Sequence, residues 1–226
     1  MPRVASLEAL QRAAAGFDVT DLTLVIEPSA EAAARRSLDQ SGLLLLGEVH
    51  GVRENPLIIR ALMQVFGLSG LALEWPADLA AVISAFTAGD ALADHPLLWL
   101  GDGRITAGHL AVLRERARAG QLDLALFDGS AGADGIMASM TAASGTLAVA
   151  GNIGRPPPGV LDIRISYGRG GFYNMRPTQI HPSISIWPEQ IRLFQEHGSV
   201  VLELPTATEA IVPHRPPPWP TFASMY

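Results

Sequence analysis

The feature that most constrains the fold is a run of four leucines at positions 43–46. Ser41 and Gly42 precede this run, and Gly47 follows it. A short, continuous apolar run between turn residues is typical of a β-strand that is covered on both faces, as strands of parallel sheets are. Apolar residues then recur at helical spacing from Leu57 to Phe66, so the sequence predicts a strand, a loop and a helix in this order.

The alternation of strands and helices continues along most of the chain. Further strands are predicted at 22–26, 71–74, 122–127 and 146–150, and further helices at the N-terminus and at 30–38, 79–86, 107–119 and 134–143. Such alternation predicts an α/β fold with a mostly parallel central sheet and helices on both faces.

The C-terminal third has a different pattern. Extra short strands are predicted at 163–167, 172–175, 183–187 and 200–204, with a glycine-rich hairpin turn at 168–171 and a short helix from Pro188 to about His197. The segment 213–226 is rich in proline and is predicted to be an extended tail. With 226 residues, of which 48% are hydrophobic, the chain is expected to form a single α/β domain over 1–226.

Charge and composition exclude several classes of function. The net charge is −6, and the densest arginine cluster, at 114–118, is interrupted by Glu115, which argues against a nucleic-acid-binding face. The absence of cysteine excludes disulfides, thiolate nucleophiles and cysteine metal sites. No apolar run approaches the roughly 20 residues of a membrane span. The N-terminal helix also lacks a signal-peptide core, so we expect a cytoplasmic protein.

Polar residues follow several predicted strands at the point where each strand ends. Glu48 and His50 follow the leucine strand, Glu74 ends the next strand, and Asp128 and Asn152 follow two later ones. The carboxyl ends of parallel strands meet at one edge of the sheet, where ligands of open sheets bind. We therefore expect these side chains to converge on a site for a small molecule.

His50 has the chemistry of a general base at neutral pH or of a metal ligand, and Glu48 could orient its ring or share the metal. Glu48 could instead pair with Arg53, and His50 could merely satisfy loop carbonyls. Glu74 is either a second carboxylate of the site or a charge at the start of a helix. Asp128 either positions Arg53 or a substrate group, or it caps the following turn.

The motif Gly47-Glu48-Val49-His50-Gly51, followed by Arg53-Glu54 and by Leu73-Glu74, resembles the superfamily that joins erythromycin esterases, ChaN-like haem-binding uptake proteins and Tiki metalloproteases. The Gly-Glu-x-His spacing is similar to ChaN-like members, and the Arg-Glu continuation is similar to the esterases. The stretch 133–138 is similar to the Arg-Asp-x-x-Met-Ala helix of this superfamily, without its arginine. The resemblance extends from about Leu43 to Gly154.

One departure from the superfamily concerns metal binding. The stretch 151–154 is similar to the motif Gly-Asn-x-His, but Gly154 replaces the histidine. A divalent metal held by Glu48 and His50 is therefore doubtful, unless His181 supplies the missing ligand. The ChaN-like resemblance allows haem as a minor alternative. Substrate binding is expected from polar residues of these motifs and strand ends, namely Arg53, Glu54, Asp128, Asp134 and Asn152.

Three functional hypotheses follow. The first is a hydrolase in which His50 activates water, Glu48 orients the imidazole or holds an ion, and Glu74 assists; Arg53 would bind an anionic or carbonyl group. The second is a degenerate, non-catalytic member that binds a small molecule or haem in the same cleft, which the replacement at Gly154 favours. The third is an accessory domain whose proline-rich segment 214–220 binds a partner.

Overall fold

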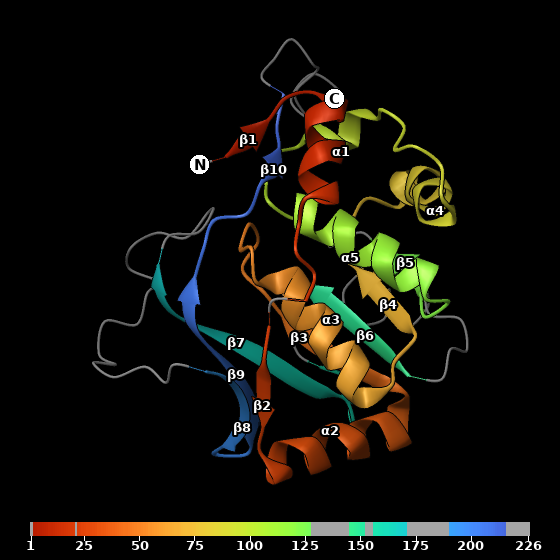
Figure 1. Cartoon of the computed structure of the whole chain (residues 1–226). Helices are drawn as coiled ribbons and strands as arrows, with labels where there is room; N and C mark the ends of the chain where they lie inside the picture. The colour runs from red at the N-terminus through yellow and green to blue at the C-terminus, as the bar shows by residue number, and fades with distance from the viewer. Residues whose placement is uncertain (1, 21, 128–144, 152–155, 171–189, 216–226) are drawn as a thin grey trace, which may run out of the picture.

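The computed structural model describes residues 2–20, 22–127, 145–151, 156–170 and 190–215. Its centre is an eight-stranded sheet with the order β2-β8-β9-β7-β3-β6-β4-β5 (Figure 1). Neighbouring strands in this order are parallel, except for the antiparallel pair β8·β9. The strands are β2 (Leu24–Ile26), β3 (Leu43–Gly47), β4 (Gly70–Leu73), β5 (Asp123–Leu126), β6 (Thr146–Ala150), β7 (Leu161–Gly170), β8 (Ile191–Glu196) and β9 (Ser199–Ala207). This architecture confirms the predicted α/β fold with extra strands late in the chain.

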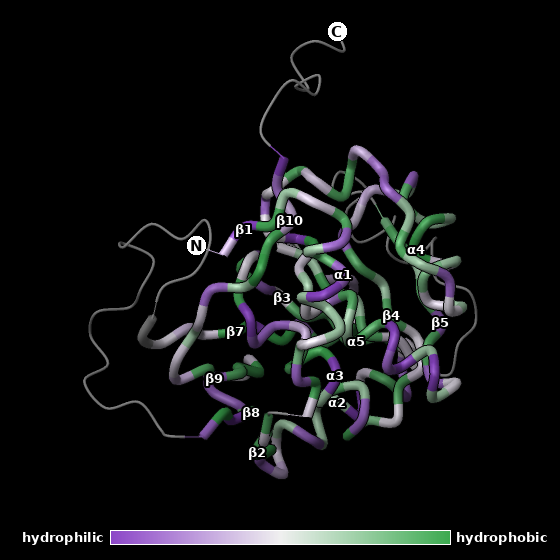
Figure 2. Tube along the Cα trace, turned by 45° about the horizontal axis from the view of Figure 1, so that its top comes forward, coloured by the Kyte–Doolittle hydropathy of each residue, from purple (hydrophilic) through white to green (hydrophobic). Residues whose placement is uncertain are grey.

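The helices of the described residues contribute their buried side chains to one core that includes Leu44 and Leu46 of β3, and in Figure 1 α2, α3 and α5 lie in front of the sheet. α2 begins at Pro28, two residues before the predicted start, because proline is favoured at the first helical position. Hydrophilic residues interrupt the hydrophobic ones along α2 and α3 (Figure 2). The helices are α1 (Leu7–Ala15), α2 (Pro28–Ser41), α3 (Asn55–Phe66), α4 (Ala80–Ala88) and α5 (Ala107–Arg118), with short 3₁₀ turns at Ala77–Leu79 and Pro96–Trp99.

β3 lies in the interior of the sheet, between β6 and β7. Its four leucines are at most 1% exposed. Leu44 and Leu46 pack with the helices, whereas Leu43 and Leu45 join a second cluster with Ala72, Ala148 and Ala150. The continuous apolar run is thus explained by burial on both faces, as the sequence predicts.

Two local predictions for the C-terminal third are wrong. Residues 191–196 form strand β8 and not a helix, because His197 and Gly198 build a two-residue hairpin turn with positive φ angles of 49° and 85°. The predicted glycine-rich turn is also wrong over 168–170, since β7 continues to Gly170 and pairs there with Ala207 of β9. Within the described residues, a hairpin turn lies at His197 and Gly198, between β8 and β9.

Segments near the two ends of the sequence lie side by side. β1 (Arg3–Val4) and β10 (Val212–Pro213) form a separate two-stranded parallel sheet (Figure 1). The start of the predicted proline-rich tail is therefore paired with the N-terminal segment. The helix predicted over 134–143 and the strands predicted over 172–175 and 183–187 lie outside the described residues. Among the helices that the structure describes, none has the length and apolarity needed to cross a membrane.

Replacement of Gly70 tests the close packing of β4 against β6. A Cβ atom at Gly70 would lie 2.3 Å from Thr146 Oγ1 and 3.0 Å from the Gly145 carbonyl oxygen, so Gly70→Ala forces the strands apart. We expect urea unfolding to show a loss of about 1–3 kcal/mol in the free energy of unfolding. Gly16→Ala is the matched control, because its Cβ would lie 3.4 Å from the nearest atom, and its effect should stay within about 0.5 kcal/mol. Equal stability of both variants would contradict this packing.

Candidate functional site

The candidate site lies at the carboxyl ends of β3, β6 and β4, which are neighbours in the sheet. The backbone N–H of Glu48 donates to Ala150 O at 3.0 Å, and that of Glu74 donates to Val149 O at 3.1 Å. These bonds extend the sheet pattern one residue past the strand ends. In the strand order β7-β3-β6-β4, the strand that follows β3 in the sequence is β4, on one side of it, and the strand that follows β6 is β7, on the other side. The chain therefore reverses its direction across the sheet between β3 and β6. Ligands of open α/β sheets bind outside the carboxyl ends of strands at such a reversal.

His50 lies between two carboxylates. Its Nδ1 is 3.1 Å from Glu48 Oε1, and its Nε2 is 3.8 Å from Glu74 Oε2. An ionised carboxylate only accepts hydrogen bonds, so the contact with Glu48 places the proton of the neutral ring on Nδ1 and leaves the Nε2 lone pair directed toward Glu74. The Glu48 side chain is 4% exposed, whereas the His50 side chain is 20% exposed. The structure therefore brings together the three residues that the sequence predicts to be catalytic.

Gly151, directly after β6, completes this arrangement through its backbone. Its N–H donates to Glu74 Oε2 at 2.7 Å and holds the carboxylate on the Nε2 side of His50. A Cβ atom at Gly151 would lie 2.7 Å from His50 Nε2, closer than real contacts allow. Any residue with a side chain at position 151 would therefore displace the His50 imidazole from this position.

The loop that carries Glu48 and His50 is fixed by two buried side chains. The Tyr167 hydroxyl of β7 accepts from Val49 N at 2.8 Å and donates to Asn55 Oδ1 at 3.1 Å. Asn55 Nδ2 in turn donates to Val49 O at 2.8 Å. Burial, followed by the charge of Glu48, raises the pKa of Tyr167 well above its usual value, so the hydroxyl remains protonated and able to donate. Tyr167 lies more than a hundred residues from the motif, and no local sequence signal indicates this contact.

A second loop brings Asp102 and Arg104 to the site. Asp102 accepts from the backbone N–H of Arg104 at 3.0 Å and from its Nε at 2.8 Å, which locks the turn. The loop is tied to the site by a bond from Gly51 N to Gly103 O and by one from Trp75 Nε1 to Arg104 O. Arg104 Nη1 lies 3.9 Å from Glu74 Oε1. Arg104 therefore approaches the predicted catalytic carboxylate.

The predicted substrate-binding residues have different surroundings. Both carboxylate oxygens of Glu54 accept from Thr208, at 2.9 Å from its backbone N–H and at 2.5 Å from its hydroxyl, so Glu54 fastens the segment after β9. The Arg53 guanidinium lies over the Phe17 ring, 5.2 Å from its centroid. Glu48 pairs with His50 through its Oε1. The other positions that the prediction names, Asp128, Asp134, Asn152, Gly154 and His181, lie outside the described residues.

The pKa of His50 reflects its two carboxylate neighbours. Burial lowers this pKa, but the hydrogen bond to Glu48 and the charges of Glu48, Glu74 and Asp102 together raise it above its usual value of 6.5. Protonation of His50 thus stabilises the fold fully below pH 6.5, and this stabilisation is lost as the pH rises through the raised folded-state pKa. The dyad is most stable in the protonated form, and the ring can accept a proton only in the neutral form.

The described residues do not fit a metal centre of the kind that the resemblance implies. Within them, no group of three or more histidine, aspartate or glutamate side chains is arranged to hold one ion. The two nitrogens of His50 face two different carboxylates on opposite edges of the ring, and Nδ1 is hydrogen-bonded to Glu48. Glu48 and His50 are therefore arranged as a hydrogen-bonded dyad and not as two ligands of one ion.

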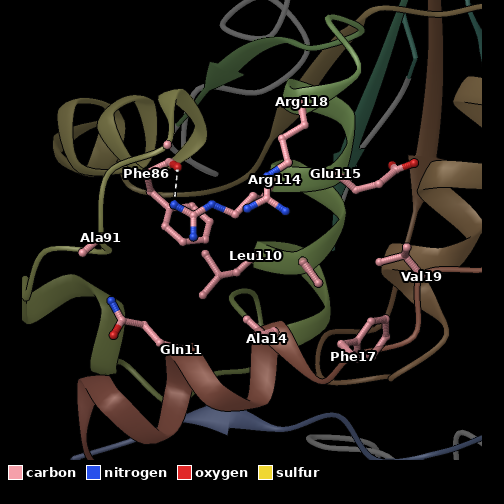
Figure 3. A pocket seen from close by; sticks show the side chains of 13 residues that line it. Gln11, Ala14, Phe17, Val19, Phe86, Ala91, Leu110, Arg114, Glu115 and Arg118 are labelled. Carbon is pink, nitrogen blue, oxygen red and sulfur yellow. Dashed lines mark hydrogen bonds between the residues drawn. The ribbon is translucent and has the colours of Figure 1, made fainter.

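A separate cavity of about 740 Å³ lies between α1, α5 and the turn that follows α4 (Figure 3). Its walls are mainly apolar and include Phe17, Phe86 and Leu110. The Arg114 guanidinium at its edge is bonded to the Phe86 carbonyl at 3.1 Å and stacks on the Phe86 ring. None of Glu48, His50 and Glu74 lines this cavity, so it is not the place of the proposed chemistry.

Tyr167→Phe tests the support of the His50 loop. The substitution leaves the buried Val49 N–H and Asn55 Oδ1 without their shared partner, so we expect a loss of about 1–3 kcal/mol in the free energy of unfolding, measured by urea denaturation. Thr87→Val removes an exposed hydroxyl that bonds to Ser84 O, and as a control it should change stability by less than about 0.5 kcal/mol. A Tyr167→Phe variant as stable as the control would rule out this support.

The pKa of His50 can be measured by NMR titration of its ring protons, assigned by comparison with His50→Gln. We expect a value above 6.5 in the unsubstituted protein. Glu48→Gln should lower it, because burial then acts with fewer opposing charges. Glu31→Gln on α2 is the control, since Glu31 pairs with exposed Arg35 on the same helix. An unchanged His50 pKa in Glu48→Gln would mean that the dyad does not form.

No family model matches the sequence, and no characterised protein or solved structure matches it either. The resemblance to the erythromycin esterase, ChaN-like and Tiki superfamily therefore stays a prediction that depends on the motifs around Glu48 and Glu74.

Proposed function

We propose that the protein is a hydrolase in which His50 acts as the general base. The observation that carries the proposal is the position of His50, with Nδ1 held by buried Glu48 and Nε2 directed toward Glu74 at an accessible edge of the sheet. A histidine oriented by a carboxylate on one nitrogen, with its other nitrogen available to solvent, is the arrangement that hydrolases use to activate a nucleophile.

The reaction requires one proton to move twice. A water molecule donates a hydrogen bond to Nε2, and as its oxygen attacks the substrate carbonyl carbon its proton passes to His50. Glu48 and Glu74 stabilise the imidazolium that forms, because each lies within 4 Å of one ring nitrogen. The bond from the carbonyl carbon to the leaving group then breaks, and His50 returns the proton to the leaving group. The Gly151 N–H holds Glu74 in place during these steps.

Binding without turnover is the second candidate function. The raised pKa of His50 favours it, because a larger fraction of the ring is protonated near neutral pH and cannot accept a proton. Gly154 also favours it, since the histidine that the superfamily motif provides is absent from the sequence.

Hydrolysis of a panel of p-nitrophenyl esters by the purified protein tests the proposal. General acid–base catalysis contributes about 10²–10⁴-fold, so His50→Gln should lower kcat/KM by at least about 100-fold. His197→Asn in the turn between β8 and β9 is the matched histidine control and should retain the rate. The rate should fall as the pH is lowered through a midpoint above 6.5, because protonation removes the base. Equal rates for His50→Gln and the unsubstituted protein would refute the proposal.

A further inference from the structure

We infer that the site selects ligands that carry a positive charge, such as an ammonium group next to an ester or amide bond, over neutral ligands of the same shape. This inference names the substrate class of the proposed hydrolase and rests on that function for turnover, but not for binding.

The first argument is the charge around His50. The carboxylates of Glu48, Glu74 and Asp102 act on His50, and the guanidinium of Arg104 lies beside Asp102 and Glu74. The three carboxylates carry three negative charges and Arg104 carries one positive charge, so the formal charge of these side chains sums to −2 when His50 is neutral and to −1 when it is protonated. The cluster is therefore negative in both protonation states of the histidine.

The second argument is that Arg104 does not neutralise Glu74. Its Nε lies 2.8 Å from Asp102 Oδ2, whereas its Nη1 is 3.9 Å from Glu74 Oε1. Arg104 is thus paired mainly with Asp102. Glu74, whose side chain is 16% exposed, keeps an accessible negative charge on the Nε2 side of His50.

The third argument is the state of Glu48. Its Oε1 bonds to His50, but its Oε2 is buried and has no hydrogen-bond partner among the residues that the structure describes. A buried carboxylate is screened less than an exposed one, so its charge acts on groups that bind beside His50. Glu48 itself is too buried to touch a ligand, and Glu74 is therefore the residue that contacts the cation.

The position of Arg53 decides between a cationic and an anionic ligand. The sequence predicts that Arg53 binds an anionic or carbonyl group, but its guanidinium lies over Phe17. The charges that act on His50 and raise its pKa are those of Glu48, Glu74 and Asp102, which are all negative. A ligand anion beside Nε2 would be repelled by the same charges that attract an ammonium group.

Choline and 3,3-dimethylbutanol provide a matched pair of probes, because they differ in charge and hardly in shape. NMR titration of the full chain, followed at the His50 ring signals, should show at least about fivefold tighter binding of choline. Bound choline should also lower the His50 pKa, since binding and proton release are reciprocally linked. Glu74→Gln should reduce the preference to less than about twofold, whereas Glu31→Gln on α2 should leave it unchanged.

The outcomes separate this inference from the proposed function. Equal affinity for both probes, or a choline preference that persists in Glu74→Gln, would overturn the inference even if His50-dependent ester hydrolysis is found. Choline preference with a lowered His50 pKa would support the inference even if His50→Gln hydrolysed the ester panel as fast as the unsubstituted protein, which is the result that refutes the hydrolase. If Glu74→Gln fails to fold, a choline affinity that is independent of NaCl concentration would overturn the inference in the unsubstituted protein.

Discussion

The arrangement of the site depends on the burial of β3 in the interior of the sheet. Its leucines are covered on both faces, and its two edges are paired with β6 and β7. A strand with these four contacts cannot shift its register without exposing apolar surface and breaking hydrogen bonds. The fixed register of β3 therefore fixes the backbone position from which the loop with Glu48 and His50 begins. The same pairing brings the ends of β4 and β6, with Glu74 and Gly151, to the same edge.

After the end of β3, the positions of the site residues depend on contacts between parts of the chain that are distant in the sequence. Tyr167 of β7 and Asn55 of α3 hold the backbone of Val49 between the two functional side chains. Gly151 leaves room for the imidazole and donates to Glu74. Trp75 holds the Arg104 loop by its indole N–H and packs edge-on against buried His109. These contacts hold the backbone between Glu48 and His50 and the Glu74 carboxylate, and such support is what general acid–base chemistry requires.

Much of the fold could be predicted from the sequence, because short apolar runs and helical periodicity are local signals. The run at Leu43–Leu46 specified a strand buried on both faces, and the rule for parallel sheets was sufficient to predict that Glu48, His50 and Glu74 converge. The helix predicted over 188–197 was wrong, because Ile191–Glu196 gains its strand conformation from a hairpin turn and from pairing with β2 and β9. The roles of Tyr167 and Gly151 could not be predicted either, since each depends on a contact that only the folded chain creates.

The carboxylates of the site have two opposite effects on His50 as a base. The carboxylates that orient His50 and stabilise its charged form also make it harder to deprotonate, so the base is available only above its raised pKa. The central claim is that Glu48 fixes the tautomer of His50, and ¹⁵N NMR of the imidazole at a pH above that pKa tests it most directly. The account predicts a neutral ring with the proton on Nδ1 and with Nε2 unprotonated. A neutral ring protonated on Nε2 would contradict it, because His50 could then neither bond to ionised Glu48 through Nδ1 nor accept a proton on the side of Glu74.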